Sequence, residues 1–246
     1  MLPVVSSAAT ADRATLAEHR LSAEGHSQLF IAPHADEWPC DVEVCFDAEG
    51  RVCFADEGPD DRDIDGTLWE RWSGSPTGPQ SLAEHHPARQ RHVMETRRCA
   101  VCARDPDRQT DGVLWLLHAH DVSPSGHWPR DVLTATPAIC RNDAQKAIRA
   151  CHALQDGYVA LRVREAELVG VRGTLYTPGA PPQPDQIIRF HEPAIHRVVA
   201  RQLILRLRDV QLDETTMRTL SHDTPHADVA HRAPAGVPTP GTLVST

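Results

Sequence analysis

The chain has 246 residues, of which 40% are apolar, and a formal net charge of −9. This length suffices for one large or two small domains with a sizeable core. The negative charge argues against a protein that coats nucleic acid, because such binding relies on basic residues that neutralise phosphates. No apolar run reaches the roughly 18 residues of a membrane span, and the first residues do not resemble a signal peptide. We therefore expect a cytoplasmic protein whose seven cysteines are thiols or metal ligands.

The residue patterns divide the chain into four regions. Residues 1–28 are polar and Ala-rich, and we expect them to be poorly ordered. Residues 29–80 hold short strand patterns separated by turn residues, which predicts a β-hairpin region. Residues 81–212 carry most of the remaining patterns and are expected to form a zinc-binding α+β domain. Residues 213–246 are polar and rich in proline, which predicts a disordered tail.

The first strong pattern is a hairpin. Residues 42–46 and 51–55 each alternate apolar and polar side chains, and residues 47–50 between them supply a turn. This arrangement predicts two antiparallel strands. A further strand is expected over residues 68–72, followed by a Gly/Pro/Ser-rich linker over residues 73–80.

The motif D-R-x-x-D-G-x-L-W occurs twice, over residues 61–69 and 107–115. Asp-Gly closes a turn because Gly accepts a positive φ, and Leu and Trp then begin the returning strand. We expect a duplicated hairpin, with both copies in one sheet or in two apposed sheets. The first copy also matches the first half of a calcium-binding EF-hand loop, but Trp72 stands where that loop needs a bidentate Glu, so an acidic turn is expected.

Helices and strands alternate through the rest of the chain. Residues 82–98 and 143–154 have helical patterns, the second with Ala144, Ala147, Ile148 and Cys151 on one face. Strands are expected over residues 113–117, 158–163, 169–176 and 187–190.

The last predicted element is a C-terminal amphipathic helix. Pro193 is placed to open it, since proline is favoured at the first helical position. The predicted helix buries Ile195, Val199, Leu203 and Leu207 on one face.

Three cysteines have the spacing of a metal site. Cys99 and Cys102 form a Cys-x-x-Cys turn, which lets two sulfurs reach one metal, and Cys140 stands at the start of a predicted helix. Thiolates are soft, charged donors that bind Zn²⁺ in tetrahedral sites, and a helix N-terminus favours the thiolate form. The alternative is that these cysteines are small core residues, as free cysteines often are.

The fourth ligand is left open by the sequence. Cys151 is favoured over Asp143, which occupies the place of the second cysteine in a second Cys-x-x-Cys, and His118 or His120 follow as further candidates. The other cysteines, Cys40, Cys45 and Cys53, lie in or beside the first hairpin and are expected to be buried thiols rather than a second metal site.

The run from about residue 68 to residue 210 resembles an uncharacterised group of bacterial zinc-binding proteins from GC-rich genomes. The matching motifs occupy residues 112–117, 137–140, 150–154, 163–164 and 173–179. That group has a Cys where this chain has Asp143, a departure that puts four-thiolate binding in doubt and raises the interest of Cys151. The resemblance implies zinc binding and no established activity.

A second resemblance is to the zinc-braced HNH nucleases. The residues Cys99, Cys102, His118, His120, Asp121 and Cys140 follow one another in the order of that family's motif. The resemblance implies a His/Asp set that holds a divalent ion such as Mg²⁺ while a histidine activates water. The chain lacks the paired His-His of the motif and the second Cys and His after Cys140. Strand alternation would instead place His118 and His120 on one solvated face.

Arginines cluster beside the Cys-x-x-Cys turn, among them Arg89, Arg91, Arg97 and Arg98. Zinc modules often present such patches to nucleic acid, although nearby acidic residues also fit an ordinary solvated face. Taken together, the patterns predict an α+β protein of short antiparallel hairpins with a treble-clef-like zinc site. The expected function is a zinc-stabilised interaction or scaffold protein with a protein partner and a structural metal. The alternatives are a divergent HNH-type nuclease and a nucleic-acid-binding module.

Overall fold

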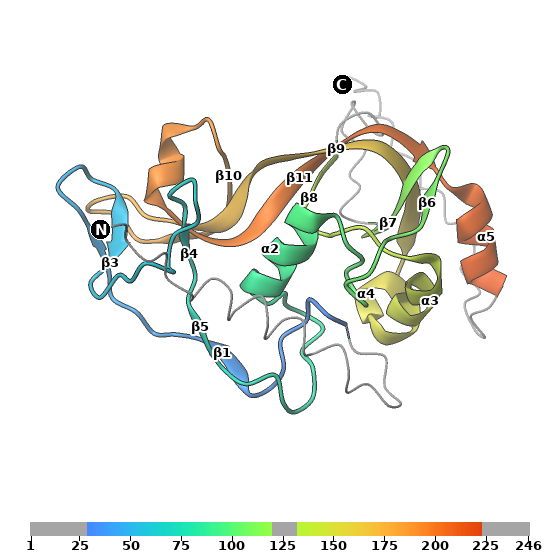
Figure 1. Ribbon diagram of the computed structural model, residues 1–246, viewed down its shortest axis with the longest axis horizontal. Helices are drawn as coiled ribbons and strands as arrows, with labels where there is room; N and C mark the ends of the chain where they lie inside the picture. The colour runs from blue at the N-terminus through green and yellow to red at the C-terminus, as the bar shows by residue number, and fades with distance from the viewer. Residues whose placement is uncertain (1–28, 120–131, 223–246) are drawn as a thin grey trace, which may run out of the picture.

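The computed structural model describes residues 29–119 and 132–222. Within them the chain forms an α+β fold with one seven-stranded sheet, two two-stranded sheets and four α-helices. Two long antiparallel strands, β9 (Tyr158–Leu175) and β11 (Val198–Leu212), pair along most of their length and run across the molecule (Figure 1). The predicted fold class, α+β, is confirmed.

The seven-stranded sheet is built around the β9–β11 pair. Its central path runs β4–β11–β9–β7–β6, with β10 added beside β9 and β8 beside β11. The added strands are β4 (Leu68–Trp69), β6 (Arg108–Gln109), β7 (Gly112–His118), β8 (Val132–Thr134) and β10 (Gln183–Arg189). β4 runs parallel to β11, whereas the other pairs are antiparallel. Because β4 comes from the predicted hairpin region and β9 from the predicted zinc domain, both regions contribute to one sheet.

The prediction of a C-terminal amphipathic helix is wrong. Pro193–Arg197 forms a single 3-10 turn, η2, and the chain then continues as strand β11. Val199, Leu203 and Leu207 are buried, as expected, but from a strand. A spacing of four residues fits one face of a helix, but in β11 it does not place all three on one face. Leu203 and Leu207 pack in one hydrophobic cluster, whereas Val199, before the register shift between Ala200 and Gln202, packs in another with Leu68. Ile204 is buried on the other face, so β11 lacks the alternation that would have marked it as a strand.

The predicted disordered tail begins with an ordered helix, α5 (Glu214–His222). Asp213 precedes it and caps its first turn, because Asp213 Oδ1 accepts a 2.8 Å hydrogen bond from the backbone N–H of Thr216. Leu220 of this helix is buried. The rest of the predicted tail, residues 223–246, and the predicted poorly ordered segment, residues 1–28, lie outside the described residues.

Strand β7 separates two hydrophobic clusters. Val113, Trp115 and Leu117 pack into the larger cluster with residues of β9, β11 and helix α2 (Pro87–Thr96). Leu114 and Leu116 point to the other face and pack against helices α3 (Arg141–Ala150) and α4 (His152–Gln155). Burial on both faces explains why the sequence of β7 reads as a continuous apolar run.

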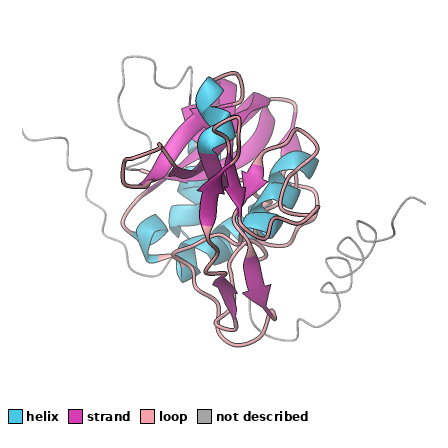
Figure 2. Cartoon of the chain, turned by 90° about the vertical axis from the view of Figure 1, so that its left-hand side faces the viewer, coloured by secondary structure: helices cyan, strands magenta, loops and turns pink. Residues whose placement is uncertain are grey.

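The smaller sheets and the helices complete the fold. β2 (Val44–Phe46) and β3 (Val52–Phe54) form the predicted hairpin. β1 (Glu37–Pro39) pairs with β5 (Trp72–Gly74), a strand within the segment predicted as strand end and linker. Figure 2 shows most of the helices gathered beneath the large strands, with a small strand pair projecting at the bottom. No helix in residues 29–119 or 132–222 has the length and apolar character needed to cross a membrane.

The two copies of the repeated motif lie at opposite ends of the central path of the large sheet. The first supplies β4 and the second supplies β6 and the start of β7. Each closes an antiparallel turn, but Arg62 pairs with Leu68 in the first, whereas Arg108 pairs with Val113 in the second. The register therefore differs by one residue. The two copies of the motif therefore both form a turn followed by a strand, but the residues that pair across the turn are not equivalent.

Candidate metal centre

The Cys-x-x-Cys turn is held by the backbone. The N–H of Ala103 donates to the carbonyl of Cys99 at 3.0 Å, and the N–H of Cys99 donates to the carbonyl of Arg104 at 2.7 Å. Ala103 adopts a positive φ of 53°, which reverses the chain directly after Cys102. The N–H of Val101 donates to Cys99 Sγ at 3.4 Å. This turn directs both sulfurs to the same side.

A second segment brings Cys140 to the turn. The N–H of Ala100 donates to the carbonyl of Ala138 at 2.9 Å, and the N–H of Ile139 donates to the carbonyl of Leu114 on β7 at 3.0 Å. Cys140 is the N-cap of α3, so its own backbone is extended and the helix begins directly after it. The sheet thus positions the start of α3 against the Cys-x-x-Cys turn.

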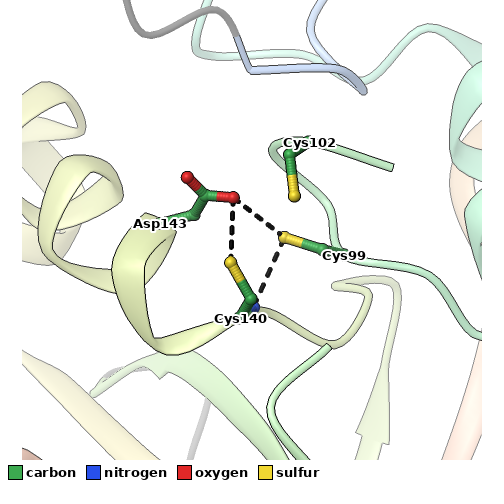
Figure 3. A group of neighbouring side chains, drawn as sticks. All are labelled: Cys99, Cys102, Cys140 and Asp143. Carbon is green, nitrogen blue, oxygen red and sulfur yellow. Dashed lines mark hydrogen bonds between the residues drawn. The ribbon is translucent and has the colours of Figure 1, made fainter. Parts of the chain in front are cut away.

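Four potential ligand atoms converge at this point (Figure 3). The sulfurs of Cys99, Cys102 and Cys140 and a carboxylate oxygen of Asp143 all lie within 4.8 Å of one another. Asp143 Oδ2 accepts hydrogen bonds from Cys140 Sγ at 3.0 Å and from Cys99 Sγ at 3.5 Å. Cys99 is 0% exposed and Asp143 is 2% exposed, whereas Cys102 and Cys140 are partly buried.

The carboxylate of Asp143 is charged despite its burial. Burial raises its pKa, but hydrogen bonds from Cys102, Cys140 and Lys146 outweigh that effect and lower the pKa to about 2. Lys146 Nζ donates to Asp143 Oδ1 at 2.9 Å, one helical turn further along α3. A buried carboxylate that is ionised and hydrogen-bonded by thiols is an environment suited to a cation.

The three thiols differ in acidity. A hydrogen bond from Cys99 lowers the pKa of Cys102 to about 6, even though burial acts in the opposite direction. Burial, followed by the hydrogen bond to Asp143, raises the pKa of Cys140 to about 11. The hydrogen bond with Cys102 and burial raise the pKa of Cys99 as well. Cys102 is therefore the first thiolate of the group, and its hydrogen bond with the neighbouring Arg104, followed by its charge, raises the pKa of Arg104.

This arrangement could hold a metal ion. A tetrahedral ion with ligands at about 2.0–2.3 Å needs donor atoms roughly 3.3–3.8 Å apart. Three sulfurs and one oxygen within 4.8 Å of one another meet that requirement with small side-chain adjustments. Cys140 Sγ and Asp143 Oδ2 are closer than this, at 3.0 Å, because a thiol proton lies between them, and a metal would replace that proton.

Cys151, the favoured fourth ligand, lies elsewhere. It caps the C-terminal end of α3, and its sulfur is 3.8 Å from Nε2 of His118. A helix rises 1.5 Å per residue, so the eleven residues from Cys140 to Cys151 span roughly 16 Å. The structure thus groups Asp143, the other candidate, with the three predicted cysteines. The rise per residue of a helix, applied to the sequence, would already have favoured Asp143 over Cys151 as the fourth ligand.

The histidines of the predicted site are only partly described. His118 ends strand β7 beside Cys151, away from the four-residue cluster. The further candidates His120 and Asp121 lie outside the described residues. The HNH-type arrangement therefore stays a prediction.

The arginine patch is partly committed to internal contacts. Arg89 is 6% exposed and forms two hydrogen bonds with the carboxylate of Glu37, at 2.6 and 2.7 Å. Arg91 lies over the ring of Trp69, and Arg98 forms an ion pair with Asp105. Arg97, at the C-cap of α2, has its pKa lowered by burial and by Arg108. Arg89 in particular holds α2 to the start of β1 rather than facing a ligand.

Comparisons with known proteins identify no relative. No protein-family model matches the chain, and no curated protein or solved structure shows significant similarity to it. Both family resemblances stated from the sequence stay predictions, and the function proposed next depends on the geometry of the described residues.

Proposed function

We propose that the protein is a zinc-stabilised interaction protein, in which Cys99, Cys102, Cys140 and Asp143 hold one structural Zn²⁺ ion. The observation that carries this proposal is the convergence of four ligand atoms from two segments that are distant in sequence. Thiolates select zinc over magnesium and calcium, which prefer sites made only of oxygen. In a reducing cytoplasm, the compartment expected from the sequence, the cysteines would be available as thiolates.

A structural role follows from the number of ligands. Catalytic zinc sites use three protein ligands and leave the fourth position to water, whereas structural sites are closed by four protein ligands. Here Asp143 supplies the fourth donor, and Cys99 is inaccessible to solvent. Lys146 and Arg104 lie beside the cluster and offset part of the negative charge that three thiolates and a carboxylate bring.

The ion would connect two parts of the smaller hydrophobic cluster. Cys99 and Val101 belong to that cluster from the turn, and Ala144 and Ile148 belong to it from α3. The proposed ligands come from both the turn and the start of the helix, so metal binding would stabilise the contact between them directly. Metal binding to such preformed ligands contributes to folding free energy.

The role in binding a partner is supported by exposed aromatic side chains. Trp38 on β1 is 53% exposed and Phe46 on β2 is 38% exposed. Large aromatic residues at the surface are typical anchors of protein interfaces. A structural metal that fixes the fold and leaves no open coordination position fits a binding protein better than an enzyme.

Metal analysis of purified protein tests the zinc site. We expect about one zinc per chain in the wild type and in Cys151→Ser, which is the matched control at a cysteine outside the cluster. Cys140→Ser and Asp143→Ala should retain much less zinc after dialysis against a weak chelator. Equal zinc in all four proteins would eliminate the proposed ligand set.

Two further assays test the role. Pull-down with the wild type and with Trp38→Ala, at equal zinc content, should recover a partner only with the wild type. Equal recovery from both would contradict the assigned surface. Incubation of plasmid DNA with the zinc-loaded protein and Mg²⁺ should leave it intact, and nicking that depends on His118 or His120 would favour the nuclease alternative.

A further inference from the structure

Cys45 and Cys53 face each other across the β2–β3 hairpin. They are direct partners in the strand register, and their sulfur atoms lie 2.9 Å apart. Both are free thiols and both are partly exposed. Neither belongs to the four-residue cluster described above.

The hairpin holds this pair in a geometry that suits a disulfide. Hydrogen bonds of 3.0 Å between Ala55 and Glu43, and of 2.9 Å between Asp47 and Arg51, lie two residues to either side of the cysteine pair. In an antiparallel ladder this alternation makes the Cys45–Cys53 position a hydrogen-bonded pair, with Cα atoms about 5.5 Å apart. Disulfides usually span Cα separations of about 4.4–6.8 Å. The Cα separation of this pair therefore lies within the range that a disulfide spans.

The register that places the two thiols together is fixed on the opposite face of the hairpin. Val52 and Phe54 are buried against Leu68 of β4 and Val199 of β11. Because side chains alternate along a strand, Cys45 and Cys53 project to the outer face, where a small reagent can reach them. A slip by one residue would expose Val52 and Phe54, so the hydrophobic contact keeps the sulfurs aligned.

We propose that Cys45 and Cys53 are a modification site, at which a small-molecule disulfide such as oxidised glutathione produces a reversible cross-strand disulfide. One cysteine thiolate attacks the small disulfide and forms a mixed disulfide, releasing one reduced small thiol. The second cysteine then attacks the protein sulfur of that mixed disulfide and releases the other small thiol. The two cysteines supply two electrons and two protons, and the small disulfide is converted to two thiols. Excess reduced thiol reverses both steps.

The competing thiol that is nearest in the sequence is Cys40. It follows β1, and its sulfur lies 2.9 Å from the hydroxyl oxygen of Ser73 on β5, not beside Cys45 or Cys53. Cys40→Ser is thus the matched control for a cysteine that is near in sequence and outside the pair. The chain also offers a convenient cleavage point, because Arg51 separates Cys45 from Cys53.

Peptide mapping of the full-length protein tests this site. The reduced, zinc-supplemented protein is incubated with oxidised glutathione, its remaining thiols are alkylated under denaturing conditions, and it is digested with trypsin without reduction. We expect a disulfide-linked pair made of residues 21–51 and 52–62, with Cys40 alkylated. Apart from that one alkyl group, the pair is lighter by two hydrogen atoms than the two reduced peptides together. The linked pair should also form in Cys40→Ser, disappear on reduction and be absent from Cys45→Ser.

Three outcomes would overturn the assignment. One is complete alkylation of Cys45 and Cys53 in the oxidised wild type. Another is accumulation of stable glutathione adducts on these cysteines without the linked peptides. The third is a linked pair that persists in Cys45→Ser and vanishes in Cys40→Ser, which would make Cys40 the partner of Cys53. None of these readouts depends on whether Cys99, Cys102 and Cys140 bind zinc.

Discussion

Gln90 hydrogen-bonds the backbone of Leu203 in the way a neighbouring strand would. The backbone N–H of Leu203 donates to Gln90 Oε1, and Gln90 Nε2 donates to the carbonyl of Leu203, both at 3.0 Å. Nε2 also donates to the carbonyl of Ala135 at 2.8 Å. Leu203 lies on β11 between the residues that pair with β4 and those that pair with β8. The amide of Gln90 thus satisfies polar backbone atoms in the interval between two short edge strands.

Replacing Gln90 with Leu should destabilise the protein strongly. The side chain is 0% exposed, so the substitution leaves buried backbone donors and acceptors without partners. Unsatisfied buried groups cost about 1–3 kcal/mol each, and we expect a total loss of about 2–4 kcal/mol. Urea unfolding of the wild type and the variant measures this total loss of stability. Gln211→Leu, at an exposed position on β11, is the control and should change the free energy of unfolding by less than about 0.5 kcal/mol. Similar losses in both variants would contradict the role of Gln90 as a hydrogen-bond partner of the backbone.

The two glycines of the repeated motif should respond differently to Ala. Gly112 has a φ of +129°, and a Cβ there would lie 2.6 Å from the backbone carbon and oxygen of Val163 on β9. Gly66 has a φ of +83° with nothing within 4 Å of the added atom. Gly112→Ala should therefore cost about 3 kcal/mol through clash and strain combined. Gly66→Ala should cost about 1 kcal/mol through backbone strain alone. Thermal unfolding of both variants would refute this reading if their losses were equal.

Substitution of Asp143 should tune metal affinity in both directions. Asp143→Cys offers a fourth thiolate in the first turn of α3 and should tighten zinc binding. Asp143→Asn removes the charge and should weaken it. Changes in the residues around zinc ligands already alter affinity about 10–100-fold, so we expect at least about tenfold in each direction. Competition with a chromophoric chelator under reducing conditions gives the affinities, and unchanged affinity in both variants would argue that Asp143 is not a ligand.

Removal of the metal should lower stability by an amount that grows with the logarithm of the zinc affinity. A ligand that binds only the folded state stabilises it by about 4 kcal/mol when present at a thousandfold excess over its Kd. We therefore expect the urea midpoint of the wild type to fall when a strong chelator is added, and the midpoint of Cys140→Ser to be unaffected. A chelator effect of the same size in Cys140→Ser would place the stabilising metal elsewhere.

His86 should make stability depend on pH in mildly acidic solution. Burial, followed by the charge of Arg89, lowers its pKa to about 4, although Glu37 at 3.6 Å acts in the opposite direction. Between the unfolded value of about 6.5 and the folded value of about 4, the unfolded state binds more protons. Acidification through this range therefore destabilises the fold, by at most about 1.4 kcal/mol per pH unit for this group.

His86→Gln should flatten the stability curve over that range. Urea unfolding at several pH values for the wild type and the variant isolates the contribution of His86 as a difference. His196→Gln, at an exposed position, serves as the control. A variant whose curve runs parallel to that of the wild type would show that His86 titrates alike in both states.

Part of the candidate site could be predicted from sequence. Cys99 and Cys102 are brought together by a local turn, and Cys140 by the start of a helix, so short-range patterns identify all three. The choice of Asp143 over Cys151 depends on which side chain of α3 meets the turn. That contact is set by β7, whose Leu114 holds the segment before the helix. The fourth position is therefore decided by packing between segments that are distant in the chain.

Sequence alone determined the local features of this protein. The β2–β3 hairpin follows from alternation and from a turn in which Asp47 binds the backbone of Arg51, and both causes lie within a few residues. Only the tertiary structure decided that residues 198–212 form a strand. Their apolar spacing fits a helix equally well, and the choice comes from thirteen register pairs with β9 and from burial on both faces. The pairing of residues 198–212 depends on β9, a strand from another part of the sequence. No residue pattern within 198–212 alone can therefore predict it.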